Sequence, residues 1–357
     1  MTQKIKSNKR ILIAPLNWGL GHATRCIPII NELITHKFEV IIASDGNALA
    51  LLQKEFPNLE SIELPSYKIT YPKKGQFFKL KLLQSSPKMM KTINAEKKAV
   101  ASIIEHYKID GIISDNRLGV HSKVVPCVFI THQLQVLSGN TTWLSTKIHQ
   151  KTIKRFHECW VPDNLGDLNL SGILGHTHMH EMPIKYIGPL SRFSKKDSVI
   201  TNDVMVLLSG PEPQRAFLET KLLNEFKNYS GKVIFIKGVI EDKQHITLEK
   251  NIRIYNFMTS EELDRTINES NLIVARSGYT TIMDLTKLSK NAFLIPTPGQ
   301  FEQEYLAKRL TNLGYAPSCK QKDFTIDKLS ELSDYKGLSA MDYEVNYNKL
   351  FSLFKGK

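Results

Sequence analysis

Long apolar runs are absent from this sequence. No stretch of about 18 or more apolar residues occurs, which argues against a membrane-spanning helix. The basic N-terminus leads into one short apolar run, residues 11–16, which is too short for the hydrophobic region of a signal peptide. The sequence therefore predicts a cytoplasmic protein, either free or at the inner face of the plasma membrane.

Cysteine is scarce as well, and its spacing is uninformative. The four cysteines are scattered, with no CxxC pair among them. This distribution fits reduced thiols in a reducing compartment and argues against a disulfide framework or a zinc knuckle. The positions are Cys26, Cys127, Cys159 and Cys319.

Acidic residues are too few to balance the basic ones. The chain has 48 Lys and Arg against 35 Asp and Glu, a formal net charge of +13. Such an excess favours an anionic partner, such as nucleic acid, lipid headgroups or a phosphorylated substrate. No aromatic-rich strand motif or recognition helix accompanies the charge, so we do not expect a nucleic-acid partner.

Strand and helix patterns alternate along all 357 residues. Short β-branched runs are followed by a glycine-rich or polar loop and then an amphipathic helix, as in residues 11–43. This order predicts α/β domains with doubly wound, Rossmann-like parallel sheets. A turn-rich, basic stretch at 188–196 is typical of a linker. We therefore predict domains at 1–191 and 197–340, and a C-terminal helix at 341–357 that could return to the N-terminal domain.

Ligands of doubly wound sheets bind beyond the carboxyl ends of the strands, so the loops that follow the strands are the candidate sites. The loop after the first strand contains Asn17, Gly19 and Gly21 and ends at His22. Its glycines allow a ligand close to the backbone, and the next helix offers free N–H groups. A tight turn without a ligand is the alternative, because Thr24 stands where a full GxGxxG has its third glycine.

His22 is the candidate general base. A histidine at a helix N-terminus tends to stay neutral, and a neutral imidazole can accept a hydroxyl proton. A helix cap or a simple hydrogen-bonding role is the alternative. Asp45 stands where a dinucleotide site would have its ribose-binding acid. Polar clusters follow two later strands, and ordinary loop polarity is the alternative for both. They are Asp115-Asn116-Arg117, the candidate acceptor contacts, and Thr131-His132-Gln133.

Three strand ends in the second half carry the strongest signals. Ser209-Gly210 follows a strand, and Ser277-Gly278 opens a helix whose N–H groups suit a pyrophosphate. Asp284 lies further along that helix, where it could bind a ribose diol. A third loop, at 296–304, is rich in groups that pair with sugar hydroxyls, among them Gln300. These loops predict, in order, contacts to phosphate, ribose and hexose.

A lysine-rich stretch and a histidine run are two further segments of unusual composition. The stretch from Lys68 to Lys98 holds nine lysines and one acid, Glu96, among apolar residues. It suits docking to an anionic bilayer, with a solvated helix pair as the alternative. The HTHMH run has three histidines, and we interpret it as a surface loop because no ligand set surrounds it; they are His176, His178 and His180.

The loops of the second half resemble the C-terminal domain of family 28 glycosyltransferases, including those that complete lipid II, and these enzymes have the GT-B fold of two Rossmann-like domains facing a cleft. The resemblance is specific over about residues 204–316. It implies donor contacts by Ser209, Gly210, Phe257, Met258, Arg276, Ser277, Gly278, Thr281, Asp284, Gln300, Gln303 and Glu304. The family usually has Glu where this chain has Asp284, and a second Gln where it has Glu304.

By this resemblance, the N-terminal domain would take the acceptor, and a hexose, N-acetylhexosamine among the options, would be transferred with inversion from a UDP-linked donor. No metal ion or cofactor would be needed, and no DxD pair suited to Mg²⁺ occurs. The acceptor stays open, a lipid-linked one included. Two alternatives remain: a nucleotide-sugar epimerase or hydrolase of the same fold, and a non-catalytic nucleotide-sugar-binding module. An NAD enzyme is less favoured, since the stronger phosphate loop lies in the second half.

Overall fold

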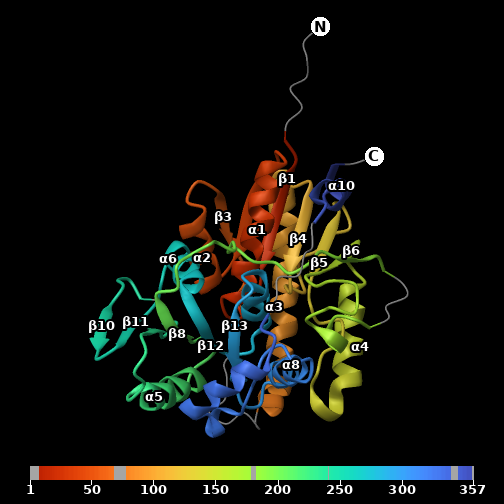
Figure 1. Cartoon of the computed structure of the whole chain (residues 1–357). Coiled ribbons are helices and arrows are strands. Elements are labelled where there is room, and N and C mark those ends of the chain that lie inside the picture. Colours follow the sequence, from red (N-terminus) through yellow and green to blue (C-terminus); the bar gives the residue numbers. More distant parts are fainter. Residues whose placement is uncertain (1–7, 68–77, 178–181, 240, 339–344, 356–357) are drawn as a thin grey trace. The chain divides into compact units, whose positions relative to one another are not determined.

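The computed structural model describes residues 8–67, 78–177, 182–239, 241–338 and 345–355, and its contacts divide the chain into two compact units (Figure 1). The first unit runs to Arg192 and also contains the described C-terminal residues. The second unit begins at Phe193. No helix in these described ranges is long and apolar enough to cross a bilayer.

The first unit is built on a parallel sheet of seven strands in the order β3-β2-β1-β4-β5-β6-β7. Its central strands are buried on both faces, as their β-branched composition predicts. The strands are β1 (Arg10–Pro15), β2 (Glu39–Ser44), β3 (Glu60–Glu63), β4 (Gly111–Asp115), β5 (Cys127–Ile130), β6 (Glu158–Val161) and β7 (Ile184–Tyr186). The helices are α1 (Gly21–Thr35), α2 (Gly46–Glu55), α3 (Phe78–Tyr107) and α4 (Thr142–Ile153).

The chain's last described residues complete the core of this first unit. They form two short helices, α9 (Tyr347–Leu350) and α10 (Ser352–Lys355), where the sequence suggested one continuous helix. Phe351 meets Phe38 edge to face with ring centroids 5.7 Å apart, and Phe354 is only 2% exposed. Gly111 leaves room for the Phe354 ring, since a Cβ there would lie 2.3 Å from it.

The second unit has a six-stranded sheet in the order β10-β11-β9-β8-β12-β13. All pairs are parallel except the β10–β11 hairpin at one edge. The strands are β8 (Asn202–Leu207), β9 (Val233–Ile236), β10 (Ile246–Glu249), β11 (Ile252–Tyr255), β12 (Ser270–Ala275) and β13 (Asn291–Leu294). The helices are α5 (Gln214–Phe226), α6 (Ser260–Asn268), α7 (Tyr279–Lys287) and α8 (Phe301–Asn312), followed by the 3₁₀ turns η4 (Gln321–Asp323) and η5 (Ile326–Asp334).

Each sheet reverses its winding direction between two particular strands. In the first unit the reversal lies between β1 and β4, and in the second between β8 and β12. Doubly wound sheets bind ligands beyond the carboxyl ends of the strands at such a point. The two candidate sites are therefore the loops after β1 and β4 and the loops after β8 and β12.

Candidate functional site

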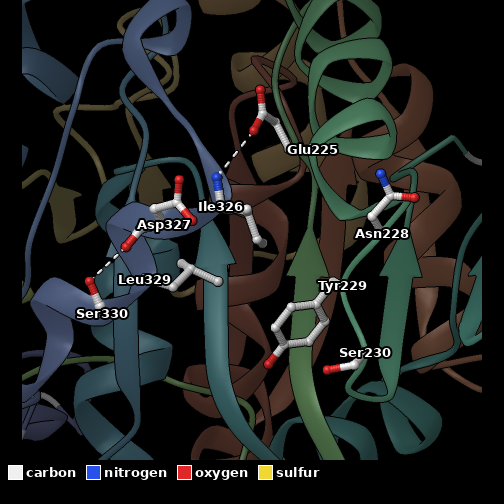
Figure 2. Close-up of a pocket in the computed structure, with 8 residues that line it drawn as sticks. All are labelled: Glu225, Asn228, Tyr229, Ser230, Ile326, Asp327, Leu329 and Ser330. Carbon is white, nitrogen blue, oxygen red and sulfur yellow. Dashed lines mark hydrogen bonds between the residues drawn. The ribbon is translucent and has the colours of Figure 1, made fainter.

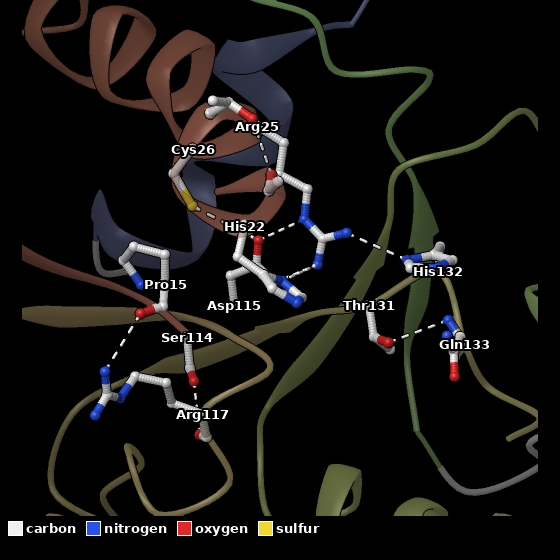
Figure 3. Close-up of polar contacts among 12 residues, drawn as sticks. Pro15, His22, Arg25, Cys26, Ser114, Asp115, Arg117, Thr131, His132 and Gln133 are labelled. Carbon is white, nitrogen blue, oxygen red and sulfur yellow. Dashed lines mark hydrogen bonds and ion pairs between the residues drawn. The ribbon is translucent and has the colours of Figure 1, made fainter. Parts of the chain in front are cut away.

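The candidate base and the first acidic cluster meet at the reversal point of the first unit. Pro15 at the end of β1 pairs with Asp115 at the end of β4. The loop after β1 leads directly into α1, which carries His22 in its first turn. His22 Nδ1 lies 2.8 Å from Asp115 Oδ1, as Figure 3 shows. Residues 93 positions apart thus form an aspartate–histidine pair.

Arg25 and His132 join this pair; His132 belongs to the second predicted polar cluster, whereas Arg25 was not among the predicted site residues. Arg25 Nε donates to Asp115 Oδ2 at 2.5 Å, and its Nη2 donates to the other carboxylate oxygen. The same Nη2 lies 2.9 Å from His22 Nδ1, and Nη1 lies 3.2 Å from His132 Nδ1 (Figure 3). Arg25 stands three positions after His22 on the same face of α1, and this spacing is the sequence signal that the two side chains are neighbours.

Burial and charge set the protonation of this cluster. Burial lowers the pKa of His22, and Arg25 lowers it further against the opposing pull of Asp115. Burial would raise the pKa of Asp115, but Arg25 and His22 outweigh it and hold the pKa at about 2. His22 is thus neutral at physiological pH beside an ionised carboxylate. Its Nε2 has no partner among the described residues, and 16% of the side chain remains accessible.

The other predicted acceptor residues divide into two groups. Gly19, at φ +78°, has no heavy atom within 4 Å of where a Cβ would stand, so this turn has open space beside it. Gly21 is the first residue of α1, and Asn116 is half-buried with φ +58°. Asn17, by contrast, donates to Asp45 at 3.1 Å and accepts from the backbone of α2.

Arg117 lies inside the protein. It is fully buried and pairs with Asp45 and Glu96, each at 2.7 Å. Tyr67 donates to the same Glu96 at 2.5 Å. Asp45 is thereby occupied and only 3% exposed, which removes it from the ribose role that a dinucleotide site would need. This buried network supports the loop after β1. His22, in contrast, keeps 16% of its side chain accessible.

The predicted donor loops meet at the reversal point of the second unit. Leu207 at the end of β8 pairs with Ala275 at the end of β12. Ser209 and Gly210 follow β8 and are exposed. Arg276 follows β12 and ties neighbouring loops together by donating to the backbone carbonyls of Ile295, Pro296 and Gln214 and to the side chain of Gln321.

A second set of bonds fixes the loop after β13 to the loop after β12. The Ser277 hydroxyl donates to the Gln303 carbonyl at 2.8 Å. The Gln303 side chain accepts from the Thr297 N–H and donates to Gln300. Glu304 accepts from the Gly299 N–H at 3.0 Å. Gln303 and Glu304 therefore shape their own loop, in addition to any role toward a ligand.

Positive potential gathers where α7 begins. Gly278 is the N-cap of α7 and makes no side-chain cap, and the N-terminus of a helix carries a positive partial charge. A Cβ at Gly278 would meet only Thr281 Oγ1, 3.8 Å away. Arg276 is 1% exposed, and none of the described acids pairs with it. Burial lowers its pKa to about 10, so it is still charged at neutral pH.

Three other predicted donor residues lie on neighbouring elements. Phe257 and Met258 are half-buried between β11 and α6, and the Phe257 carbonyl accepts from Gln244 at 3.0 Å. Asp284 lies half-buried in the second turn of α7. The carboxyl edge of this sheet thus brings the predicted phosphate and ribose groups onto one helix, with the predicted hexose loop tied beside them.

Comparison with known proteins agrees with this geometry. Residues 213–340 match the C-terminal domain of glycosyltransferase family 28. The second unit is a family 28 glycosyltransferase domain. An uncharacterized glycosyltransferase of Methanosarcina acetivorans is 25% identical over 86% of this chain and 84% of its own. A UDP-N-acetylglucosamine--N-acetylmuramyl-(pentapeptide) pyrophosphoryl-undecaprenol N-acetylglucosamine transferase of Bacillus cytotoxicus is 33% identical over 32% of each chain.

Solved structures extend the likeness to both units of the chain. The glycosyltransferase SnogD of Streptomyces nogalater superimposes with a TM-score of 0.60 at 14% identity, over 93% of this chain and 92% of that one. MurG of Acinetobacter baumannii gives 0.52 at 13% identity, over 91% and 89%. The predicted GT-B fold and the family resemblance are therefore confirmed, and the chain is a glycosyltransferase.

Another hollow of the second unit lies away from these loops. The hollow in Figure 2 is lined by residues such as Tyr229 and Ser230, which precede β9, and by Asp327 of η5. It therefore opens at the amino edge of the sheet, opposite the donor loops, and contains no predicted site residue. In the described ranges, no three histidine, cysteine or acidic side chains gather as a metal site would require.

Two predicted segments fall partly outside the described residues. His178 and His180 do, whereas His176 lies 3.2 Å from the buried Asp163 through its Nε2. Residues 68–77 of the basic segment do as well, and its later part belongs to α3. Glu96, the single acid there, is buried against Arg117. Docking to a bilayer by this segment stays a prediction.

Proposed function

We propose that this glycosyltransferase transfers a hexosyl group, N-acetylhexosaminyl among the options, from a UDP-linked sugar to an acceptor hydroxyl, with inversion and without a metal ion. The donor would bind the second unit and the acceptor the first, in the cytoplasm. UDP is proposed because the curated relatives that share the family 28 segment are named for UDP-N-acetylglucosamine. Solved relatives of this fold include VinC with dTDP and SpnG with thymidine diphosphate, which supports a nucleoside diphosphate as the bound unit.

The observation that carries the proposal is the arrangement around Gly278. An uncapped helix N-terminus, open space at the glycine and a buried, acid-free Arg276 meet at the reversal point of the sheet. The positive end of a helix and a desolvated cation together favour a doubly charged diphosphate. Because that charge grows as the glycosidic bond breaks, the same groups would stabilise the leaving group in the transition state, in the place of a metal.

His22 supplies the second half of the reaction. In the tautomer whose Nδ1 donates to Asp115, the Nε2 lone pair is free to act as the base, and 16% of the side chain is accessible. Nε2 would remove the proton from the acceptor hydroxyl as that oxygen attacks the anomeric carbon from the face opposite the diphosphate. Attack from that face inverts the anomeric centre. Asp115, hydrogen-bonded to the ring, would orient His22 for this proton transfer.

The first test is a thermal-shift panel of UDP-, GDP- and dTDP-sugars on the intact chain. A UDP-sugar should raise the unfolding temperature most, because a ligand that binds only the folded state stabilises it. If no nucleotide sugar raises the unfolding temperature, the proposal is wrong. Release of UDP that depends on an added acceptor distinguishes transfer from hydrolysis or epimerisation, which need none. Binding without any turnover would indicate a non-catalytic module.

A variant pair tests the base. His22→Asn should lower kcat by about 10²- to 10⁴-fold, the usual contribution of a general base, and leave the thermal shift by donor unchanged. His106→Asn is the matched control, because His106 is exposed on α3 and its ring packs against that of the neighbouring Tyr107. Equal kcat for the two variants would remove His22 from the mechanism.

A further inference from the structure

The carboxylate that supports His22 already has a strong partner. Arg25 is 1% exposed and lies one turn after His22 on α1. Its Nε donates to one oxygen of Asp115 at 2.5 Å, and its Nη2 donates to the other. Both oxygens of Asp115 are therefore held by a fully buried guanidinium, in the two-pronged geometry that makes arginine–carboxylate pairs strong.

This pairing changes what Asp115 does to its neighbour. A lone carboxylate 2.8 Å from an imidazole would favour the protonated ring. Arg25 cancels that charge, and its own Nη2 lies 2.9 Å from His22 Nδ1, where it disfavours a second cation. The pair as a whole is nearly neutral, so Asp115 can orient His22 without drawing a proton onto it.

The same contacts restrict the orientation of the ring. A guanidinium can only donate, and an ionised carboxylate can only accept. Nδ1 of His22 can thus donate to Asp115 or accept from Arg25, and in either case the ring is fixed in one plane. Arg25 is itself held by donating to Nδ1 of His132 at 3.2 Å. Base chemistry uses the form in which Nδ1 carries the proton, because Nε2 is then the acceptor.

We propose that Arg25 is a positioning residue that keeps His22 an uncharged, fixed base by neutralising Asp115. This role rests on the proposed function for its place in catalysis, but its electrostatic content stands on the contacts alone. In the described part of the chain, the ionisable groups that face His22 are three: Asp115 at the end of β4, Arg25 on α1, and His132 after β5. Cys26 reaches the cluster through Asp115, at 3.7 Å from its carboxylate.

The test is the titration of the His22 ring by NMR in the intact, histidine-labelled chain, with the signal assigned from His22→Asn. In Arg25→Met, Asp115 loses its counterion, and the His22 midpoint should rise by about 1 unit or more. In Asp115→Asn, Arg25 is left facing the ring, and the midpoint should fall. In the double variant both charges are gone, and the midpoint should return toward that of the wild type.

Turnover supplies a second measurement. The acid limb of the kcat/KM profile should move to higher pH in Arg25→Met, in step with the NMR midpoint, which loss of packing alone would not cause. An unchanged midpoint in Arg25→Met overturns the inference. If Arg25→Met does not fold, Asp115→Asn is compared with the double variant instead, because the double variant leaves no unpaired buried charge. Equal midpoints in those two variants overturn it as well.

The titration needs no turnover, so its outcome is separate from that of the proposed function. If the wild type transfers no sugar but the midpoints shift as expected, the proposed function alone is refuted.

Discussion

Gly278→Ala separates ligand binding from folding more sharply than any other substitution. Gly278 has φ −70° and ψ 138°, which alanine adopts without strain. The new methyl would meet only Thr281 Oγ1, at 3.8 Å, so the fold has room for it. Replacing such a glycine reduces the freedom of the unfolded chain and should leave stability equal or raise it by about 0.4–1 kcal/mol.

The same methyl would occupy the space in which we place the diphosphate. Displacing a phosphate oxygen from one charge-assisted hydrogen bond costs about 1.5–3 kcal/mol. Since each 1.4 kcal/mol is about a tenfold change in affinity, the Kd for UDP should rise about 10- to 100-fold. Equal or higher stability together with weaker UDP binding would indicate that the space beside Gly278 is kept open for a ligand.

The assay combines urea unfolding with calorimetric titration of UDP. Gly166→Ala is the matched control, because Gly166 has no heavy atom within 4 Å of its Cβ position and lies in the first unit. It should leave stability equal or slightly raised, as Gly278→Ala does, and leave the Kd for UDP unchanged. An unchanged Kd in Gly278→Ala would refute the placement of the diphosphate, and a large loss of stability would refute the claim that the space is open.

Three further predictions concern stability and charge. Arg276→Met should lose about 3 kcal/mol of stability in urea unfolding, since the buried carbonyls that Arg276 binds would lose their donor. Arg276→Lys should keep more UDP affinity than Arg276→Met in calorimetric titration, because it keeps the charge. Burial lowers the pKa of His149 to about 4, so between pH 6.5 and 4 the unfolded chain binds a proton there that the folded chain does not, and stability should fall over that range. His149→Phe should reduce this pH dependence of the unfolding temperature, and an unchanged dependence would contradict the prediction. Phe354→Ala should cost about 3–5 kcal/mol, measured by urea unfolding, and a near-neutral effect would mean that the C-terminal helices are not part of the core.

The sequence predicted most of the fold because the local signals agree with the tertiary structure. At α6, for example, Thr259 and Glu262 form a capping box, a local signal for the start of the helix. The strand β10 is harder to predict, since it has only four residues and all of them are exposed, although apolar and polar residues alternate in it. The predicted C-terminal helix was wrong in its continuity, because the chain breaks at Phe351, whose buried ring serves the core of the first unit.

Candidate site residues were predictable where they follow a strand, and their partners were not. The loops after β8 and β12 could be located from β-branched runs followed by small residues. The pairing of Arg25 with Asp115 spans 90 positions, and nothing in the local pattern of either residue indicates it. Arg117 is the converse case: its position after β4 suggested a ligand contact, but its charge is balanced inside by Asp45 and Glu96.

The way the C-terminal residues close the first unit has a consequence for biosynthesis. Because Phe351 and Phe354 belong to the core beneath β1 and β4, the domain that is translated first lacks part of its interior until the second domain has been made. The usual N-to-C order of domain folding is then reversed at its last step. A nascent chain that stalls after residue 338 would display a second unit with its core in place and a first unit with apolar surface still open, a form that chaperones and proteases would recognise.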